Sequence, residues 1–232
     1  MWRTKYALLA ASTRWPLLLN VLVRLLPPGD ALAGDWDTEY ASGGWDWLAD
    51  LGQVPHNFVI AGYCSRLRPQ AAILDVGCGE GTLHAILRQL GYRLYVGIDI
   101  SAAAVERVAA RTDERTRFLV VDGERFETND RFDIIVLNEV LYYSRQPLRV
   151  IAHLSTLLAP DGLFIISMCQ AGFRDALRKQ LIWRDIGAGY QVLKQISLDD
   201  GGGLPRIIKV IHPREPAVSA VHGNRPHGDS RR

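Results

Sequence analysis

The sequence predicts an α/β domain with a doubly wound, mostly parallel seven-stranded sheet that ends in an antiparallel pair of strands. From position 71 onward, short apolar runs alternate with helical stretches of about ten residues. Alternation of this kind implies right-handed βαβ crossovers and a parallel sheet. A glycine-rich segment, residues 77–81, separates the first apolar run from the first helical stretch. A glycine turn at this position is typical of Rossmann-like folds.

Five largely apolar runs predict the parallel strands. The first, 71–76, stops at Gly77 and suits a strand that is buried on both faces of the sheet. The other four lie at 94–98, 118–121, 132–137 and 163–168. Residues 160–162 (Pro-Asp-Gly) predict a turn just before the fifth strand. Residues 191–198 and 206–211 flank a glycine-rich segment and predict the antiparallel pair.

Helical spacing of apolar residues predicts the connecting helices. Residues 82–90 carry leucine and isoleucine at this spacing, and Gly91 can end the helix. Ser101 can cap a helix over 102–110, and a helix over 147–158 begins with a proline, which suits a first turn. Two upstream segments, 36–51 and 57–67, also have helical character, and we expect them to cover one end of the sheet.

The two ends of the chain differ from this domain, which we place at residues 35–213. Residues 1–34 predict an apolar to amphipathic helical segment, and 214–232 a flexible basic tail. The apolar run 15–26 is interrupted by Arg24 and is too short to span a membrane, which needs about 20 apolar residues. A helix docked on the domain, a helix in a membrane interface and a secretory signal remain open for this run.

Composition argues against several classes of function. The chain has 232 residues and a formal net charge of +2, so no overall basic field indicates a nucleic-acid partner. The cysteines Cys64, Cys78 and Cys169 lie far apart and lack the CxxC spacing of zinc sites. They are typical of reduced thiols in a cytoplasmic protein. We therefore expect no metal site and a cytoplasmic location, with membrane contact through residues 15–26 and the oligomeric state left open.

The glycine-rich segment carries the main functional information. Gly77, Gly79 and Gly81 lie between a strand and a helix, where they allow a tight turn and a close approach of the backbone to a ligand. Asp99 ends the second strand, from which a carboxylate can bind ribose hydroxyls. The spacing differs from the G-x-G-x-x-G of nicotinamide-binding proteins, and the Lys-Ser/Thr pair of a P-loop does not follow. Asp75, just before the loop, would repel a pyrophosphate but suits a cationic ligand such as S-adenosylmethionine (SAM).

Several segments together resemble the motifs of class I SAM-dependent methyltransferases. ILDVGCGEGTL is similar to their first motif, GIDIS to the second, VVDGERF to the third and FDIIVLNEVLYY to the fourth, and LLAPDGLFIIS resembles their strand-five signature. The similarity covers residues 36–213 and is particularly close to bacterial enzymes that methylate small molecules, saccharides or lipid-linked glycans. It implies a SAM-dependent methyltransferase (EC 2.1.1) that methylates an O or N atom of a small-molecule or glycan acceptor.

The resemblance also implies a set of cofactor-binding residues. Asp99 would bind the ribose, Asp122 and Gly123 the adenine, and Tyr40 would close over the methionine end of SAM. The Asp-Gly pair departs from the Gly-Asp or Asp-Ala of many relatives. The complete implied set is Tyr40, Asp75, Gly77, Cys78, Gly79, Gly81, Asp99, Ile100, Asp122, Gly123 and Asn138.

Residues after the fourth and fifth strands are expected to face the acceptor, because ligands bind beyond the carboxyl ends of parallel strands. Glu139 is the candidate general base, with a contact to SAM or the acceptor and a structural role as alternatives. Tyr142, the second catalytic candidate, would orient the acceptor. Trp45, Trp47 and residues 172–183 are candidates for the pocket wall.

Other functions and other residue roles fit this sequence less well. A SAM-binding regulatory protein without turnover is the main alternative, but the intact glycine loop and Asp99 favour an enzyme. A nucleic-acid methyltransferase would be expected to carry Asn/Asp-Pro-Pro-Tyr/Phe after the fourth strand, where this chain has Asn-Glu-Val-Leu. His84 and His153 are interpreted as packed or surface residues, and Cys78 as a small residue of the loop.

Overall fold

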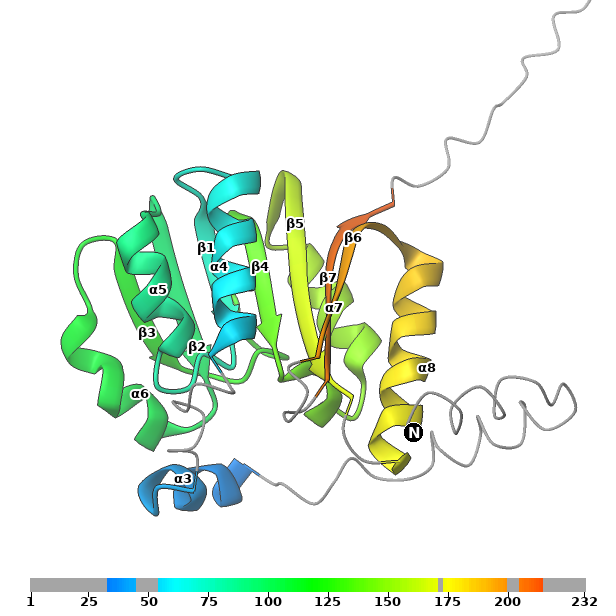
Figure 1. Cartoon of the computed structure of the whole chain (residues 1–232). Coiled ribbons are helices and arrows are strands. Elements are labelled where there is room, and N and C mark those ends of the chain that lie inside the picture. Colours follow the sequence, from blue (N-terminus) through cyan, green and yellow to red (C-terminus); the bar gives the residue numbers. More distant parts are fainter. Residues whose placement is uncertain (1–32, 45–53, 171–172, 200–204, 215–232) are drawn as a thin grey trace, which may run out of the picture.

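The structure of the protein, a computed structural model, describes residues 33–44, 54–170, 173–199 and 205–214. Its strands form one seven-stranded sheet in the order β3-β2-β1-β4-β5-β7-β6 (Figure 1). The strands are β1 (Ala72–Val76), β2 (Leu94–Asp99), β3 (Thr116–Val120), β4 (Phe132–Asn138), β5 (Leu158–Cys169), β6 (Tyr190–Leu198) and β7 (Arg206–Pro213). Neighbours among β1–β5 pair in parallel, whereas β7 pairs antiparallel with β5 and β6. The predicted fold class is confirmed.

Helices cover both faces of the sheet (Figure 1). They are α3 (Ala33–Ala41), α4 (Pro55–Leu67), α5 (Thr82–Leu90), α6 (Ala102–Val108), α7 (Pro147–Ser155) and α8 (Phe173–Gly189), with the 3₁₀ turns η2 (Ala109–Arg111) and η3 (Leu141–Tyr143). Apolar side chains of α4, α5 and α6 form the core on one face, and those of α7 and α8 form the core on the other. Strand β1 is buried along its whole length because both faces are covered.

Local sequence sets the ends of several elements. The Ser101 hydroxyl accepts a hydrogen bond from the Ala104 N–H at 3.2 Å, which confirms the predicted N-cap of α6. Gly91 ends α5 with a φ of 88°, a conformation that glycine adopts readily. Helices α6 and α7 end at Val108 and Ser155, slightly before the predicted positions, because η2 follows the first and β5 begins shortly after the second.

The predicted turn at residues 160–162 is wrong. These residues lie inside β5, which begins at Leu158. The register against β4 passes from Phe132↔Leu158 to Ile134↔Leu163, so the extra residues of β5 form an irregularity between two paired segments. Proline and glycine are tolerated at such an interruption because these residues have no paired residue on the neighbouring strand β4.

Some predicted features lie outside the described residues. These are the apolar run 15–26, Trp45 and Trp47, the connection at 200–204 and the tail at 215–232. The helix predicted over 36–51 is described only as far as residue 44, and it begins earlier, at Ala33. Within the described ranges, no helix combines the length and the apolar character needed to cross a membrane.

Candidate cofactor and acceptor site

The carboxyl ends of β1, β2 and β4 meet at one edge of the sheet, because these strands are adjacent and parallel. A cavity of about 780 Å³ lies there, which is a size typical of small-molecule sites. The predicted residues that line it are Tyr40, Asp75, Gly77, Cys78, Gly79, Asp99, Ile100, Asp122, Gly123, Asn138, Glu139 and Tyr142. Among the predicted cofactor-binding and catalytic residues, all of which the structure describes, only Gly81 lies outside this lining, and it directly precedes α5.

The glycine loop has a backbone conformation that side chains disfavour. Gly77, Gly79 and Gly81 have φ values of 71°, 51° and 69°, in the left-handed region that glycine adopts without steric cost. A Cβ added to Gly79 would lie 2.8 Å from the hydroxyl of Tyr40. The glycine at this position therefore permits both the turn and the close packing of Tyr40 over it.

Asp99 fastens the glycine loop to the end of β2. One carboxylate oxygen accepts a hydrogen bond from the Gly79 N–H and the other from the Ser101 N–H, each at 2.9 Å. Burial raises the pKa of this carboxyl, while the backbone hydrogen bonds act to lower it. A carboxylate oxygen can accept more than one hydrogen bond, so Asp99 retains capacity for ligand hydroxyls. Its position fits the predicted contact with a ribose.

Asp75 presents an unpartnered oxygen to the same cavity. The residue is 1% exposed, and its Oδ2 accepts a hydrogen bond from the Tyr95 hydroxyl at 2.7 Å. Its Oδ1 has no hydrogen-bond partner within the described part of the chain. Burial raises the pKa of this carboxyl to about 7, against the lowering effect of the Tyr95 bond. A buried acceptor of this kind needs a donor, and the ammonium group of SAM fits that need.

Helix α3 lies at the start of α6 and is attached to it by Asp37. The Asp37 carboxylate accepts hydrogen bonds from the Ser101 hydroxyl at 2.6 Å and from the Ala103 N–H at 3.2 Å. These bonds lower the pKa of the Asp37 carboxyl, with the Ser101 bond as the largest cause. A carboxylate at a helix N-terminus also interacts favourably with the helix dipole.

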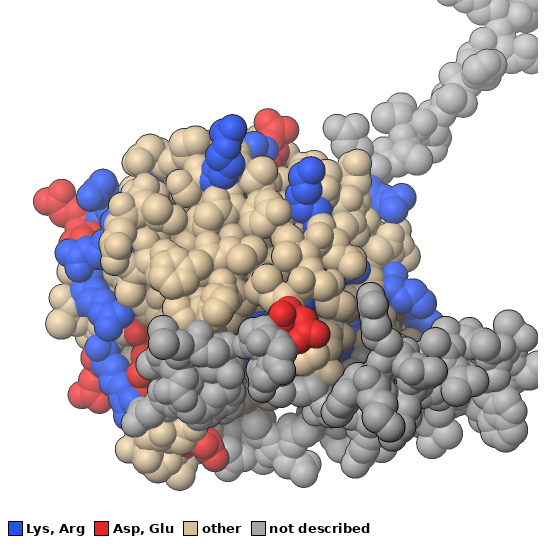
Figure 2. All heavy atoms as spheres, viewed as in Figure 1, with Lys and Arg blue, Asp and Glu red and all other residues tan. Residues whose placement is uncertain are grey.

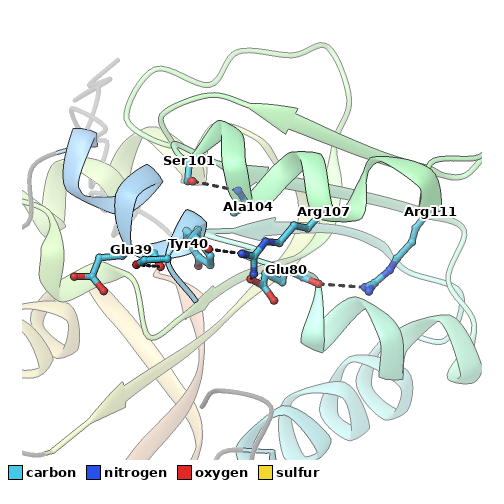
Figure 3. A network of polar contacts seen from close by, with 8 residues as sticks. Glu39, Tyr40, Glu80, Ser101, Ala104, Arg107 and Arg111 are labelled. Carbon is cyan, nitrogen blue, oxygen red and sulfur yellow. Dashed lines mark hydrogen bonds and ion pairs between the residues drawn. The ribbon is translucent and has the colours of Figure 1, made fainter. Parts of the chain in front are cut away.

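Arg107 of α6 makes the second attachment. Its guanidinium group donates a hydrogen bond to the backbone carbonyl of Tyr40 and pairs with Glu80 of the glycine loop (Figure 3). Tyr40 is buried between this contact and Gly79. The helix that carries Tyr40 is therefore held against the glycine loop, and the contact of Tyr40 with SAM stays a prediction.

Glu139 connects three strands rather than projecting freely into the cavity. Its carboxylate accepts hydrogen bonds from the Ser167 hydroxyl at 2.5 Å, the Cys169 N–H at 2.6 Å and the Tyr142 hydroxyl at 3.1 Å. The Nε of Arg206 lies 3.5 Å from its Oε1. These contacts occupy most of the hydrogen-bonding capacity of the carboxylate, so the role of Glu139 as a base stays a prediction.

Three lining residues, Trp36, Arg178 and Lys179, were not predicted individually. Trp36 packs edge-on against Tyr143, with ring centroids 4.8 Å apart. Arg178 donates hydrogen bonds to backbone carbonyls of the segment after β4, and Lys179 places its Nζ 4.0 Å from the ring centroid of Tyr142. All three lie in segments that the sequence indicated, but composition does not show which side chains face a cavity.

The residues interpreted as non-catalytic, His84, His153 and Cys78, are buried or hydrogen-bonded within the domain. His84 is buried with its Nε2 2.9 Å from the Tyr92 hydroxyl, and burial lowers its pKa to about 4. The Nε2 of His153 lies 2.9 Å from the Phe126 carbonyl oxygen. Burial raises the pKa of the Cys78 thiol, which disfavours a nucleophilic thiolate. Across the described ranges, no three His, Cys, Asp or Glu side chains are grouped so that they could hold a metal ion.

A family model described as a methyltransferase domain matches residues 57–198, more than half of the chain. The chain belongs to the class I SAM-dependent methyltransferases. Nodulation protein S of Bradyrhizobium diazoefficiens is 38% identical to this methyltransferase over 100 residues, which cover 41% of this chain and 47% of that protein. The chain spans about half the length of the curated relatives it matches.

Solved structures share the methyltransferase fold. The N-methyltransferase NodS from Bradyrhizobium japonicum WM9, in complex with S-adenosyl-L-homocysteine (SAH), matches with a TM-score of 0.66 and 18% identity, over 79% of this chain and 98% of that chain. The 1,6-didemethyltoxoflavin-N1-methyltransferase of Burkholderia thailandensis, with 1,6-didemethyltoxoflavin and SAH bound, matches with a TM-score of 0.65 and 20% identity, over 79% of this chain and 87% of that chain.

Proposed function

We propose that this chain is an enzyme that transfers a methyl group from SAM to an O or N atom of a small-molecule acceptor, a class that includes saccharides and lipid-linked glycans. The observation that carries the proposal is the placement of Asp75 and Asp99 on either side of the glycine loop. Asp75 offers an unpartnered buried oxygen, and Asp99 retains capacity to bind hydroxyls. The ammonium group and the ribose of SAM suit these two positions.

Two solved neighbours support the proposal, because both were crystallised with SAH and one also with a small-molecule substrate. SAM would supply a sulfonium methyl group, whose S–C bond breaks as the new O–C or N–C bond forms. The residues of this chain would hold the donor and acceptor in line, which supplies much of the rate of such transfers. Tyr142, which lines the cavity, would orient the acceptor, and Glu139 is the candidate to take the proton that the acceptor loses.

Binding and turnover test the proposal separately. Calorimetry with SAM, SAH and NAD should show affinity for the first two ligands only. Incubation with methyl-labelled SAM and fractionated small-molecule extracts should then yield a labelled product. A protein without affinity for SAM or SAH overturns the proposal.

A SAM-binding protein without turnover is the second candidate, and the engaged carboxylate of Glu139 is the observation that favours it. Such a protein would bind SAH yet transfer no label to any fraction.

The role of Glu139 can be measured with Glu139→Gln. As a base, Glu139 would be needed for turnover but not for cofactor binding, so the variant should lose turnover with unchanged SAH affinity. Ser167→Ala is the matched control, because it removes one hydrogen bond to Glu139 and leaves the carboxylate in place. Equal losses of turnover and SAH affinity in Glu139→Gln would assign a binding role instead.

A further inference from the structure

The acceptor side of the cavity contains a buried lysine. Lys179 of α8 is 5% exposed and lines the cavity. Its Nζ lies 4.0 Å from the ring centroid of Tyr142. An aromatic face stabilises a lysine in its charged form, and the ammonium group carries three N–H donors.

The other cationic side chains of the cavity are engaged or exposed. Arg206 pairs with Glu139, and Arg178 donates to backbone carbonyls after β4, whereas Arg145 is exposed to solvent. Lys179 takes part in none of the ion pairs or hydrogen bonds found among the described residues. An ammonium group that lies in a partly enclosed cavity is attracted to an anionic ligand more strongly than it would be in open solvent. A ligand that brings a negative charge could therefore pair with Lys179.

The strand order separates Lys179 from the cofactor half of the cavity. Helix α8 follows β5, and β4 lies between β5 and β1, which carries the glycine loop. Neighbouring strands are ~4.8 Å apart, so the ends of β1 and β5 are separated by roughly 10 Å. The carboxyls of Asp75 and Asp99 lie on β1 and β2, away from α8. The cavity is therefore acidic towards the cofactor side and cationic towards the acceptor side.

We propose that the acceptor carries an anionic group, a carboxylate or a phosphate, and that the ammonium group of Lys179 binds it. The inference rests on the proposed function, since it describes the acceptor half of the same site. Tyr142 would then hold the lysine in place, because its ring lies against the ammonium group. Lys179 would select among acceptors by charge, which is a determinant of specificity.

The test compares each anionic ligand with an uncharged counterpart that has the same aromatic ring. Protein saturated with SAH is titrated in a calorimeter with three pairs of probes: 4-hydroxybenzoate and 4-hydroxybenzamide, 4-aminobenzoate and 4-aminobenzamide, and phenyl phosphate and phenol. We expect at least one anion to bind about tenfold or more tightly than its neutral partner, as for a buried charge-assisted hydrogen bond. The pair that shows the preference distinguishes carboxylate from phosphate.

Variants assign that preference to the lysine. Lys179→Met should bring the anion and its neutral partner to within about twofold of each other, whereas Lys179→Arg should retain part of the preference. Lys209→Met is the matched control, because its Nζ also lies over an aromatic ring, 4.5 Å from the Trp183 centroid, but Lys209 does not line the cavity. Melting temperatures establish that each variant is folded. The comparison of anionic with neutral probes in the unaltered protein does not depend on the variants.

Three results overturn the proposal. The first is equal binding of every anion and its neutral partner, or no binding of any probe, to protein that binds SAH. The second is an anion preference that survives Lys179→Met. The third is a tenfold loss of SAH affinity in Lys179→Met, which would assign the lysine to the carboxylate of the cofactor. A protein that binds no SAH at all would instead overturn the proposed methyltransferase function. Failure of that function and failure of the acceptor proposal are therefore distinguishable.

Discussion

The guanidinium group of Arg107 joins the backbone carbonyl of Tyr40 to the carboxylate of Glu80 (Figure 3). One side chain of α6 thus connects α3 to the glycine loop, and residues of both line the cavity. Because the Tyr40 hydroxyl packs against Gly79, movement of α3 away from the loop would open the cofactor side of the cavity.

Arg107→Ala should therefore weaken SAH binding. We expect a loss of about fivefold, which corresponds to the ~1 kcal/mol of one partly exposed, charge-assisted hydrogen bond. Calorimetry with SAH measures it. Arg117→Ala is the control, since it removes a similarly exposed ion pair with Asp130 that does not line the cavity. Equal affinities in the two variants would contradict the connection.

Asp99→Ala should weaken SAH binding more strongly. Hydrogen bonds to a charged group contribute ~1.5–3 kcal/mol, so the affinity should fall by roughly 10- to 150-fold. Circular dichroism should show that the sheet is retained, because Asp99 lies at the carboxyl end of β2, beyond most of its ladder. Unchanged SAH affinity in a folded variant would contradict the placement of the ribose at Asp99.

Gly79→Ala should abolish tight SAH binding. The new methyl group would meet the Tyr40 hydroxyl, and the left-handed backbone disfavours alanine. Gly62→Ala is the matched control, because Gly62 lies in α4 with open space around a Cβ. The control should be more stable than the unaltered protein by about 0.5–1 kcal/mol, because alanine has the higher helix propensity. Similar SAH affinities for both variants would refute the steric argument.

Stability should depend on pH through Asp75. Burial raises its folded-state pKa to about 7 from an ordinary value of 3.8, so between these pH values the folded protein holds a proton that the unfolded chain has lost. The unfolding free energy should therefore fall as the pH rises between these two values. Asp75→Asn should remove this part of the slope while keeping an acceptor for the Tyr95 hydroxyl.

Urea unfolding at several pH values, with and without the Asp75→Asn substitution, measures the two slopes. Parallel slopes in the two proteins would show that Asp75 titrates normally in the folded state. Addition of SAH should favour the ionised carboxylate, because an ammonium group next to Asp75 lowers its pKa.

Figure 2 shows Lys and Arg side chains together with Asp and Glu side chains on the one face of the molecule that it draws. The +2 net charge of the chain agrees with this mixed surface. Within the cavity, the carboxyls of Asp75 and Asp99 belong to β1 and β2, whereas Lys179 belongs to α8. Overall composition could not reveal that separation, because it sums over the whole chain.

The sequence by itself determined the sheet, the glycine loop and the position of Asp99, because these depend on local backbone preferences and on apolar periodicity. Its error at residues 160–162 has the same origin, since Pro-Asp-Gly favours a turn, whereas the paired segments before and after it keep these residues within β5 as an irregularity. Only the tertiary structure decided which partners each polar side chain has. Ser167 and Arg206 reach Glu139, and Lys179 reaches Tyr142, through the strand order and the packing of α8. Contacts between residues so far apart in the chain leave no local pattern from which they could be predicted.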